Sequence, residues 1–214
     1  TQNQAFSALL FVYRVLLRRE LEGLGDRVRA RPKRRLPVVL SRDQVRSVLR
    51  ELQAMSPTHG LMGTLLYGSG LRLMECLRLR VRDVDFARHQ ITLRSGKGGK
   101  DRPAILPRSA EDPLRKHLER VQQLHRADLD AGFGSVRLPY ALARKYPKAA
   151  WNLEWQWLFP GKQITTDPRT GARRRHHIHS SSVQRSVSRA GRRARLPQRV
   201  TCHILRHSFA THLL

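Results

Sequence analysis

The sequence predicts a mainly α-helical domain with one small antiparallel β-sheet. Most of the chain carries apolar residues at helical spacing, whereas the alternation typical of strands occurs only at residues 90–94 and 102–106. A hydrophobic fraction of 40% over 214 residues indicates a packed core, not a basic disordered tail. The predicted class is therefore mainly α with a small β-hairpin.

The first part of the chain divides into a helix, a linker and a helical region. Residues 2–22 show a helical pattern, and residues 23–36 are basic, contain Pro32 and have the composition of a linker. The run Ser41-Arg42-Asp43-Gln44 matches a capping box and predicts a helix through Leu52. Two further helices are expected at residues 60–67 and 72–79.

The second part begins with the hairpin. A glycine- and lysine-rich turn over residues 95–101 joins the two predicted strands. Residues 109–129 return to a helical pattern, and residues 132–160 are irregular and rich in aromatic side chains. A basic loop is expected at residues 161–176, and the last helices near residues 180–193 and 202–214.

The charge balance indicates a polyanionic partner. Lys and Arg number 42 against 16 Asp and Glu, a formal net charge of +26 with a pI near 11.7. Nucleic acid is the usual partner of such a chain, and the absence of an apolar run near 18 residues argues against a membrane. Cys76 and Cys202 are the only cysteines and are expected as buried, reduced thiols in a cytoplasmic protein.

Three separated basic elements carry candidate chemistry. Arg72 opens a helix, Lys97 lies on the hairpin turn, and His203 and Arg206 are spaced i, i+3 on a late helix. Arginines can neutralise the oxygens of a phosphate in its transition state, and lysine and histidine can move protons. Each residue alone also fits an ordinary surface charge. No cluster of carboxylates suggests a two-metal nuclease, which favours metal-free phosphoryl transfer.

No metal site is predicted. His203 and His207 are spaced i, i+4, but the glutamate that a zincin motif requires does not follow His203. The run 174–179 is rich in histidine, and we interpret it as a basic strand or loop that faces DNA.

Three segments together resemble the catalytic-domain motifs of tyrosine recombinases: residues 70–77, 96–102 and 203–212. Three more, residues 125–129, 141–147 and 155–160, resemble the extra segment of integron integrases. The resemblance implies the DNA breaking-rejoining enzyme fold. It assigns residues 1–22 to the last helix of an N-terminal DNA-clamping domain, 23–36 to an interdomain linker, and 37–214 to a catalytic domain that ends early and carries an insertion at about 125–160.

The resemblance also implies roles for single residues. Arg72 and Arg206 would hold the scissile phosphate, His203 would assist proton transfer, and Lys97 would act as the general acid, with Lys100 as the alternative. Glu75 would support the active-site helix, and the nucleophilic tyrosine is expected beyond Leu214. Further side chains are expected to contact DNA: Lys100, Arg102, Tyr140, Arg144, Lys145, Trp155, Arg174, Arg175, His177 and His179.

The function implied is that of an integron integrase, which integrates and excises gene cassettes through a 3′-phosphotyrosine intermediate. The resemblance implies no metal, no ATP and no other cofactor. Its partners would be a duplex attachment site and a folded single-stranded hairpin site, bound by a homotetramer, without a membrane, in the bacterial cytoplasm at the nucleoid. This 214-residue chain is expected to bind DNA without cleaving it. Two alternatives stay open: a non-catalytic DNA-binding remnant, and a generic chromosomal or phage tyrosine recombinase.

Overall fold

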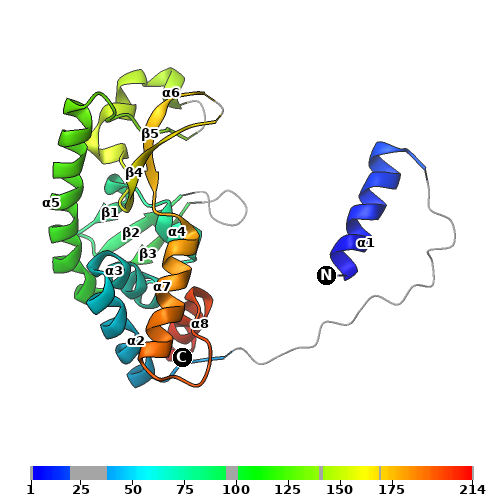
Figure 1. Ribbon diagram of the computed structural model, residues 1–214, viewed down its shortest axis with the longest axis vertical. Coiled ribbons are helices and arrows are strands. Elements are labelled where there is room, and N and C mark those ends of the chain that lie inside the picture. The colour runs from blue at the N-terminus through cyan, green and yellow to red at the C-terminus, as the bar shows by residue number, and fades with distance from the viewer. Residues whose placement is uncertain (1, 20–37, 95–100, 140–141, 169, 214) are drawn as a thin grey trace. The chain divides into compact units, whose positions relative to one another are not determined.

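The computed structural model describes residues 2–19, 38–94, 101–139, 142–168 and 170–213 and divides the chain into two compact units, Thr1–Leu36 and Pro37–Leu214 (Figure 1). The first unit contains helix α1 (Gln2–Phe11), which continues into a π-helical turn at Val12–Leu16. This agrees with the helical pattern expected near the start of the chain. All further elements belong to the second unit.

The second unit opens with two helices whose starts are set by serine caps. Helix α2 (Arg42–Met55) begins with the predicted capping box, in which the Ser41 hydroxyl accepts from the Gln44 N–H and the Gln44 side chain accepts from the Ser41 N–H. Helix α3 (Pro57–Gly68) begins three residues earlier than expected, because the Ser56 hydroxyl accepts from the His59 N–H. Proline at the first helical position suits this start.

A short helix and a small sheet follow. Helix α4 spans Leu73–Leu77, and a 3₁₀ turn lies at Val81–Asp83. Strands β1 (Val84–Asp85), β2 (Gln90–Leu93) and β3 (Arg102–Ile105) form an antiparallel sheet in the order β1-β2-β3. The predicted hairpin is confirmed, with Leu93 opposite Arg102. The two-residue strand β1 was not anticipated.

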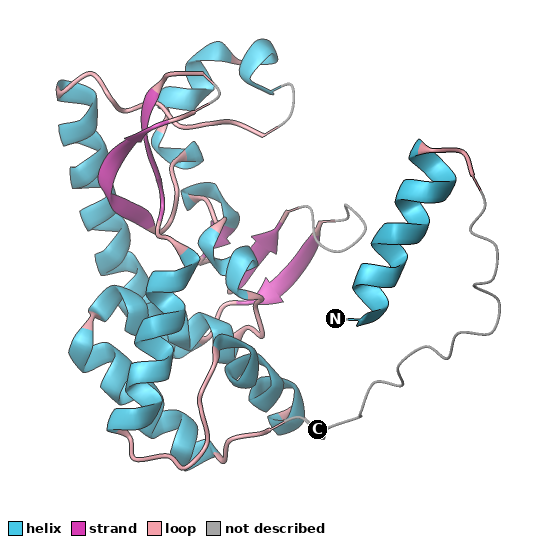
Figure 2. Ribbon diagram, turned by 45° about the vertical axis from the view of Figure 1, so that its right-hand side comes forward, coloured by secondary structure: helices cyan, strands magenta, loops and turns pink. Residues whose placement is uncertain are grey.

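The middle of the unit contains the region of the expected insertion. Helix α5 (Arg108–Asp130) is followed by short helical turns only: α6 (Leu142–Lys145), then 3₁₀ turns at Pro147–Trp151 and Leu153–Trp155. Strands β4 (Pro160–Thr166) and β5 (Arg173–His177) then form a second antiparallel hairpin beside α5 (Figure 2). The unit closes with α7 (Ser180–Arg193) and α8 (Cys202–His212).

The hairpin β4–β5 corrects the loop expected at residues 161–176. Strand β5 reads Arg-Arg-Arg-His-His, so it lacks the apolar alternation by which strands are recognised. Its backbone groups are paired with β4 along the ladder, and its long side chains lie along neighbouring elements. Strand formation here is decided by that pairing and not by the residue pattern.

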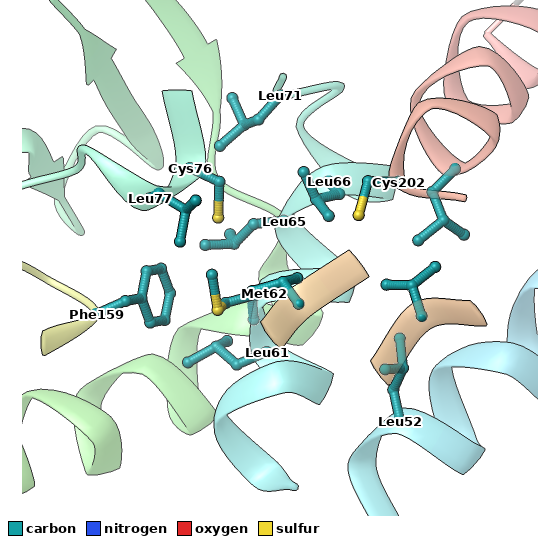
Figure 3. Close-up of a cluster of buried hydrophobic side chains, with 14 of the residues drawn as sticks. Leu52, Leu61, Met62, Leu65, Leu66, Leu71, Cys76, Leu77, Phe159 and Cys202 are labelled. Carbon is teal, nitrogen blue, oxygen red and sulfur yellow. The ribbon is translucent and has the colours of Figure 1, made fainter. Parts of the chain in front are cut away.

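The core surrounds helix α3. Met62, Leu65 and Leu66 are fully buried, and Phe159 and the two cysteines close around them (Figure 3). The predicted packing role of Phe159 and the predicted burial of Cys76 and Cys202 as free thiols are confirmed. Burial raises the pKa of both thiols, that of Cys202 to about 11, so they remain protonated at neutral pH.

Within the described residues, no helix combines the length and the apolar character needed to cross a bilayer.

Candidate active site

The turn between α3 and α4 brings α8 next to the first candidate arginine. Gly70 has a φ of +61°, in the left-handed region that favours glycine. A Cβ at this position would overlap the ring of Phe209 on α8. Glycine therefore permits both the turn and the close approach of α8, and Arg72, two residues later, is the N-cap residue of α4.

Glu75 is the centre of the site. Its carboxylate accepts from the Arg72 backbone N–H and from the Arg72 guanidinium, each at 2.7 Å. The same carboxylate lies 3.0 Å from Nη2 of Arg102 on β3 and 3.5 Å from Nη1 of Arg206 on α8. One carboxylate thus gathers three arginines from three separate elements. We call Arg72, Glu75, Arg102, His203 and Arg206 the arginine cluster.

The ionisation of Glu75 follows from this arrangement. Burial alone raises the pKa of its carboxyl group, but the hydrogen bonds from Arg72 and the charge of Arg102 outweigh that effect and lower it. The Arg206 guanidinium has its pKa lowered by burial and by the charges of Arg72 and Arg102, which Glu75 opposes. Glu75 therefore stays ionised and offsets part of the repulsion among the arginines.

Helix α8 presents the remaining cluster residues. The Thr201 hydroxyl caps it by accepting from the Ile204 N–H, and Ser208 holds it against the core. The buried Ser208 hydroxyl accepts from the Leu40 N–H at 3.0 Å and donates to the Ile204 carbonyl. Because Cys202 and Leu205 point into the core, His203 is exposed and Arg206 is half-buried beside Glu75.

Two expected proton donors cannot be placed. Lys97 and Lys100 lie outside the described residues, in the segment between β2 and β3. Leu93 at the end of β2 lies opposite Arg102 at the start of β3, and Arg102 lies 3.0 Å from Glu75. The general-acid assignment to Lys97, with Lys100 as the alternative, stays a prediction.

A second basic region lies on the insertion side of the unit. A cavity of about 880 Å³ is bordered by the cations Arg82, Arg94, Lys145 and Lys148 and by the rings of Tyr146 and Trp155. The guanidinium of Arg82 lies 4.3 Å from the centre of the Trp155 ring, within the range of a cation–π contact. We call these residues the insertion-side pocket. Of the expected DNA contacts, Lys145 and Trp155 border it, Arg144 is exposed next to it, and Tyr140 lies outside the described residues.

Arg175 was expected to contact DNA, but its side chain is bonded to other residues of the fold. Its guanidinium makes a two-pronged ion pair with Asp128 of α5, with both N–O distances at 2.6 Å. It also donates to the carbonyls of Gly161 and Lys162, and only 12% of its side chain is exposed. Arg175 therefore fastens the β4–β5 hairpin to α5, and its donors are occupied inside the fold.

The other expected contacts on this hairpin are more open. Arg174 is half-buried, and its Nε has no partner among the described residues. His177 packs its ring edge-on against Trp157, and burial lowers its pKa. His179 is exposed and caps α7 by accepting from the Ser181 N–H. Arg174 and His177 lie on β5, and His179 lies at the start of α7. None of the contacts described for these three residues involves Glu75.

Two residues of these sites, Arg82 and Arg94, were not singled out from the sequence, and both border the insertion-side pocket. His207 was considered only as a metal ligand, and it lies against His203 with 2.7 Å between their Nε2 atoms. The i, i+4 spacing of the histidines was a readable signal, whereas no local pattern marks Arg82 or Arg94. Arg82 directly precedes the buried Asp83 in the sequence, and Arg94 is paired with the Asp83 carboxylate at 2.7 Å.

Comparison with known proteins decides the family. Residues 38–214 match the model of the phage integrase family. The chain belongs to this family. Its recombinase-type motifs and its fold, mainly helical with small antiparallel sheets, are thereby confirmed, while the integron subfamily is not distinguished.

Several longer relatives match all or nearly all of this phage integrase family member. Proteins named "Integrase/recombinase" from Escherichia coli and Pseudomonas aeruginosa are each 45% identical over 214 residues, covering all of this chain and 63% of theirs. A protein named "Tyrosine recombinase XerA" from Thermococcus kodakarensis is 32% identical over 99% of this chain and 62% of its own length. The chain thus spans somewhat under two thirds of the length of these three relatives.

Solved structures agree on the fold. The family member is similar to the crystal structure of XerA recombinase, with a TM-score of 0.55 and 22% identity over 99% of this chain and 60% of that one. It is also similar to XerH site-specific recombinase bound to its difH substrate in a pre-cleavage complex, with a TM-score of 0.61 and 18% identity over 99% and 53%.

Proposed function

We propose that the protein containing this chain is a tyrosine site-specific recombinase that cleaves and rejoins DNA strands by metal-free phosphoryl transfer. The observation that carries the proposal is the convergence of Arg72, Arg102 and Arg206 on one carboxylate, with His203 on the same helix as Arg206. Family membership and the DNA-bound state of the XerH structure support it.

Each group has a distinct task in this proposal. Arg72 and Arg206 bind the non-bridging oxygens of the scissile phosphate, where negative charge accumulates in the transition state. His203 assists proton transfer at that phosphate, and Lys97 donates a proton to the departing 5′-oxygen, which leaves as a hydroxyl. The covalent phosphotyrosine link conserves the phosphodiester energy, so the exchange requires no ATP. The nucleophile is the one role that we assign to no residue of this chain.

The first test measures DNA binding by the 214-residue chain. Sites are selected from a random library of duplexes and hairpins, and the best one is titrated at 50 and 200 mM salt. With six to ten phosphates contacted, affinity should fall by about 10³–10⁵-fold over this range. A salt-independent affinity would contradict the proposed partner.

The second test locates the scissile phosphate. Single neutral methylphosphonates are placed along the selected site, and binding is compared between the wild-type chain and Arg206→Ala. At the phosphate that Arg206 holds, the methylphosphonate and Arg206→Ala remove the same contact. Combining them should therefore weaken binding no more than either change alone. Additive losses at every position would contradict the assigned role of Arg206.

We propose further that the protein is of the integron type and recognises unpaired bases in a folded single-stranded site, as well as duplex attachment sites, when assembled as a homotetramer. The insertion-side pocket supports this, because cations and aromatic faces bordering one cavity suit a base flanked by phosphates. Replacing residues 139–148 by a short linker should abolish the preference for bulged hairpins and leave duplex binding intact. A preference that survives would favour the generic recombinase.

The competing function is DNA binding without catalysis. The hydroxyl of Tyr67 is hydrogen-bonded to His212 at 2.9 Å, and no tyrosine of the described residues has its hydroxyl paired to a cluster residue. A nicked duplex that traps a covalent phosphotyrosine separates the two functions. The longer protein should form the adduct and the 214-residue chain should not; an adduct formed by the chain alone would contradict our assignment.

A further inference from the structure

Two histidine rings meet on the exposed side of α8. His203 and His207 are one helical turn apart, and their Nε2 atoms approach to 2.7 Å. The ring centres are 4.1 Å apart at an interplanar angle of 76°. At this distance one Nε2 carries a hydrogen and donates it to the lone pair of the other, so both nitrogens are directed at one point.

This arrangement matches half of a metal coordination sphere. Neutral imidazole nitrogen binds Zn²⁺ at about 2.0–2.1 Å, and two nitrogens in tetrahedral geometry are then about 3.3 Å apart. The rings need to separate by about half an ångström, which a small rotation of the exposed His203 side chain supplies. The Nε2 hydrogen that one ring donates to the other moves to Nδ1 of its own ring by tautomeric exchange with water, so both Nε2 lone pairs can face an ion.

We propose that His203 and His207 together bind a divalent transition-metal ion such as Zn²⁺, and that the bound ion blocks the phosphate site. The second half of this statement rests on the proposed function. Within the described residues, no group of three or more His, Cys, Asp or Glu side chains surrounds a common point. The protein therefore supplies two ligands, and water occupies the other positions.

The surrounding positive charge weakens the binding of a cation. We therefore expect an inhibitory ion that exchanges readily and not a permanently bound one. Arg206 and Arg72 repel a dication, and the carboxylate of Glu75 offsets them only in part because it is already shared by three arginines. A bound ion takes the lone pair with which His203 would accept a proton. Metal binding and proton transfer are thus mutually exclusive at this histidine.

The test titrates the 214-residue chain with Zn²⁺ by isothermal calorimetry, without DNA. One site should appear, and His207→Gln should weaken it at least tenfold. Cu²⁺ in the same site should show two nitrogen ligands by electron paramagnetic resonance, and one in His207→Gln. The matched control is His89→Asn, because His89 is also exposed and is bonded to Glu111 at 2.6 Å. An unchanged affinity in His207→Gln, or a loss in His89→Asn instead, overturns the metal site.

A second titration separates this inference from the proposed function. Zn²⁺ should weaken binding of the selected DNA site by the wild-type chain and have no such effect on His207→Gln. Zinc binding that depends on His207 but leaves DNA affinity unchanged would uphold the metal site and overturn the block, and it would count against a phosphate next to His203.

Discussion

The arginine cluster and the insertion-side pocket are both basic, yet they hold their cations in different ways. In the cluster, Arg72, Arg102 and Arg206 share the carboxylate of Glu75, which is 12% exposed. In the pocket, Arg82 lies over the ring of Trp155, and Arg94 is paired with the carboxylate of Asp83. The first arrangement fixes charges at set positions from three elements, as a single phosphate requires. The second offers a flat aromatic face beside cations, which suits a base and its backbone.

The two regions also differ in how they are attached to the fold. The cluster is built on α4, β3 and α8, all packed on the core. The hairpin on the insertion side is fastened to α5 by the ion pair between Arg175 and Asp128. The following predictions test whether these differences decide function, beginning with the largest effect.

The largest effect should come from breaking this ion pair. Asp128→Ala leaves the Arg175 guanidinium without its carboxylate in a site where both side chains are nearly buried. The free energy of unfolding should fall by about 3–5 kcal/mol in urea denaturation. Asp130→Ala, at an exposed position of the same helix, is the control and should change it little. An equal loss in both variants would show that the attachment does not depend on this pair.

The second effect concerns cleavage by the longer protein. Arg206→Ala removes the proposed phosphate ligand on α8 and should lower the cleavage rate of a nicked duplex by about 10²–10³-fold. Arg82→Ala removes a cation of the insertion-side pocket and should leave that rate within a few-fold of wild type. Equal losses from both substitutions would erase the functional distinction between the two regions.

The third effect concerns the choice between hairpin and duplex. Trp155→Ala removes an aromatic face from the pocket and should reduce the affinity for a bulged hairpin by about 1–3 kcal/mol, with duplex affinity unchanged. Trp151→Ala is the control, since Trp151 is 44% exposed and does not border the pocket. Fluorescence anisotropy with both DNAs measures the difference. A parallel loss on duplex and hairpin would contradict base recognition by Trp155.

The smallest effect is the pH dependence of the cluster. The native pKa of Glu75 lies below its ordinary value of 4.5, so its ionised form stabilises the fold fully above that value. This contribution is lost as the pH falls from about 5 through the lowered native pKa. Glu75→Gln cannot titrate, so the difference in unfolding free energy between the two proteins should shrink over the same window. A difference in unfolding free energy that stays constant down to pH 3 would contradict the role of the Glu75 carboxylate in holding the three arginines.

Local chemistry explains which parts could be predicted. The Ser41 capping box, the hairpin β2–β3 and the i, i+3 pair of His203 and Arg206 depend on residues close in sequence, so their patterns are readable. The hairpin β4–β5 was missed for the opposite reason. Its strand of arginines and histidines is held by an ion pair between residues 47 positions apart. Arg175 was consequently expected on DNA and instead lies inside the fold.

The sequence by itself determined the family and the mainly helical class with its first hairpin, and it indicated Arg72, His203 and Arg206 as candidate site residues. Only the tertiary structure decided that Arg102 joins them at Glu75, that Arg175 turns inward and that Arg82 lies over Trp155. The physical reason is the reach of the long arginine side chain. Its charge is readable from the sequence, but the carboxylate, carbonyl or ring that it meets is set by which distant elements pack together.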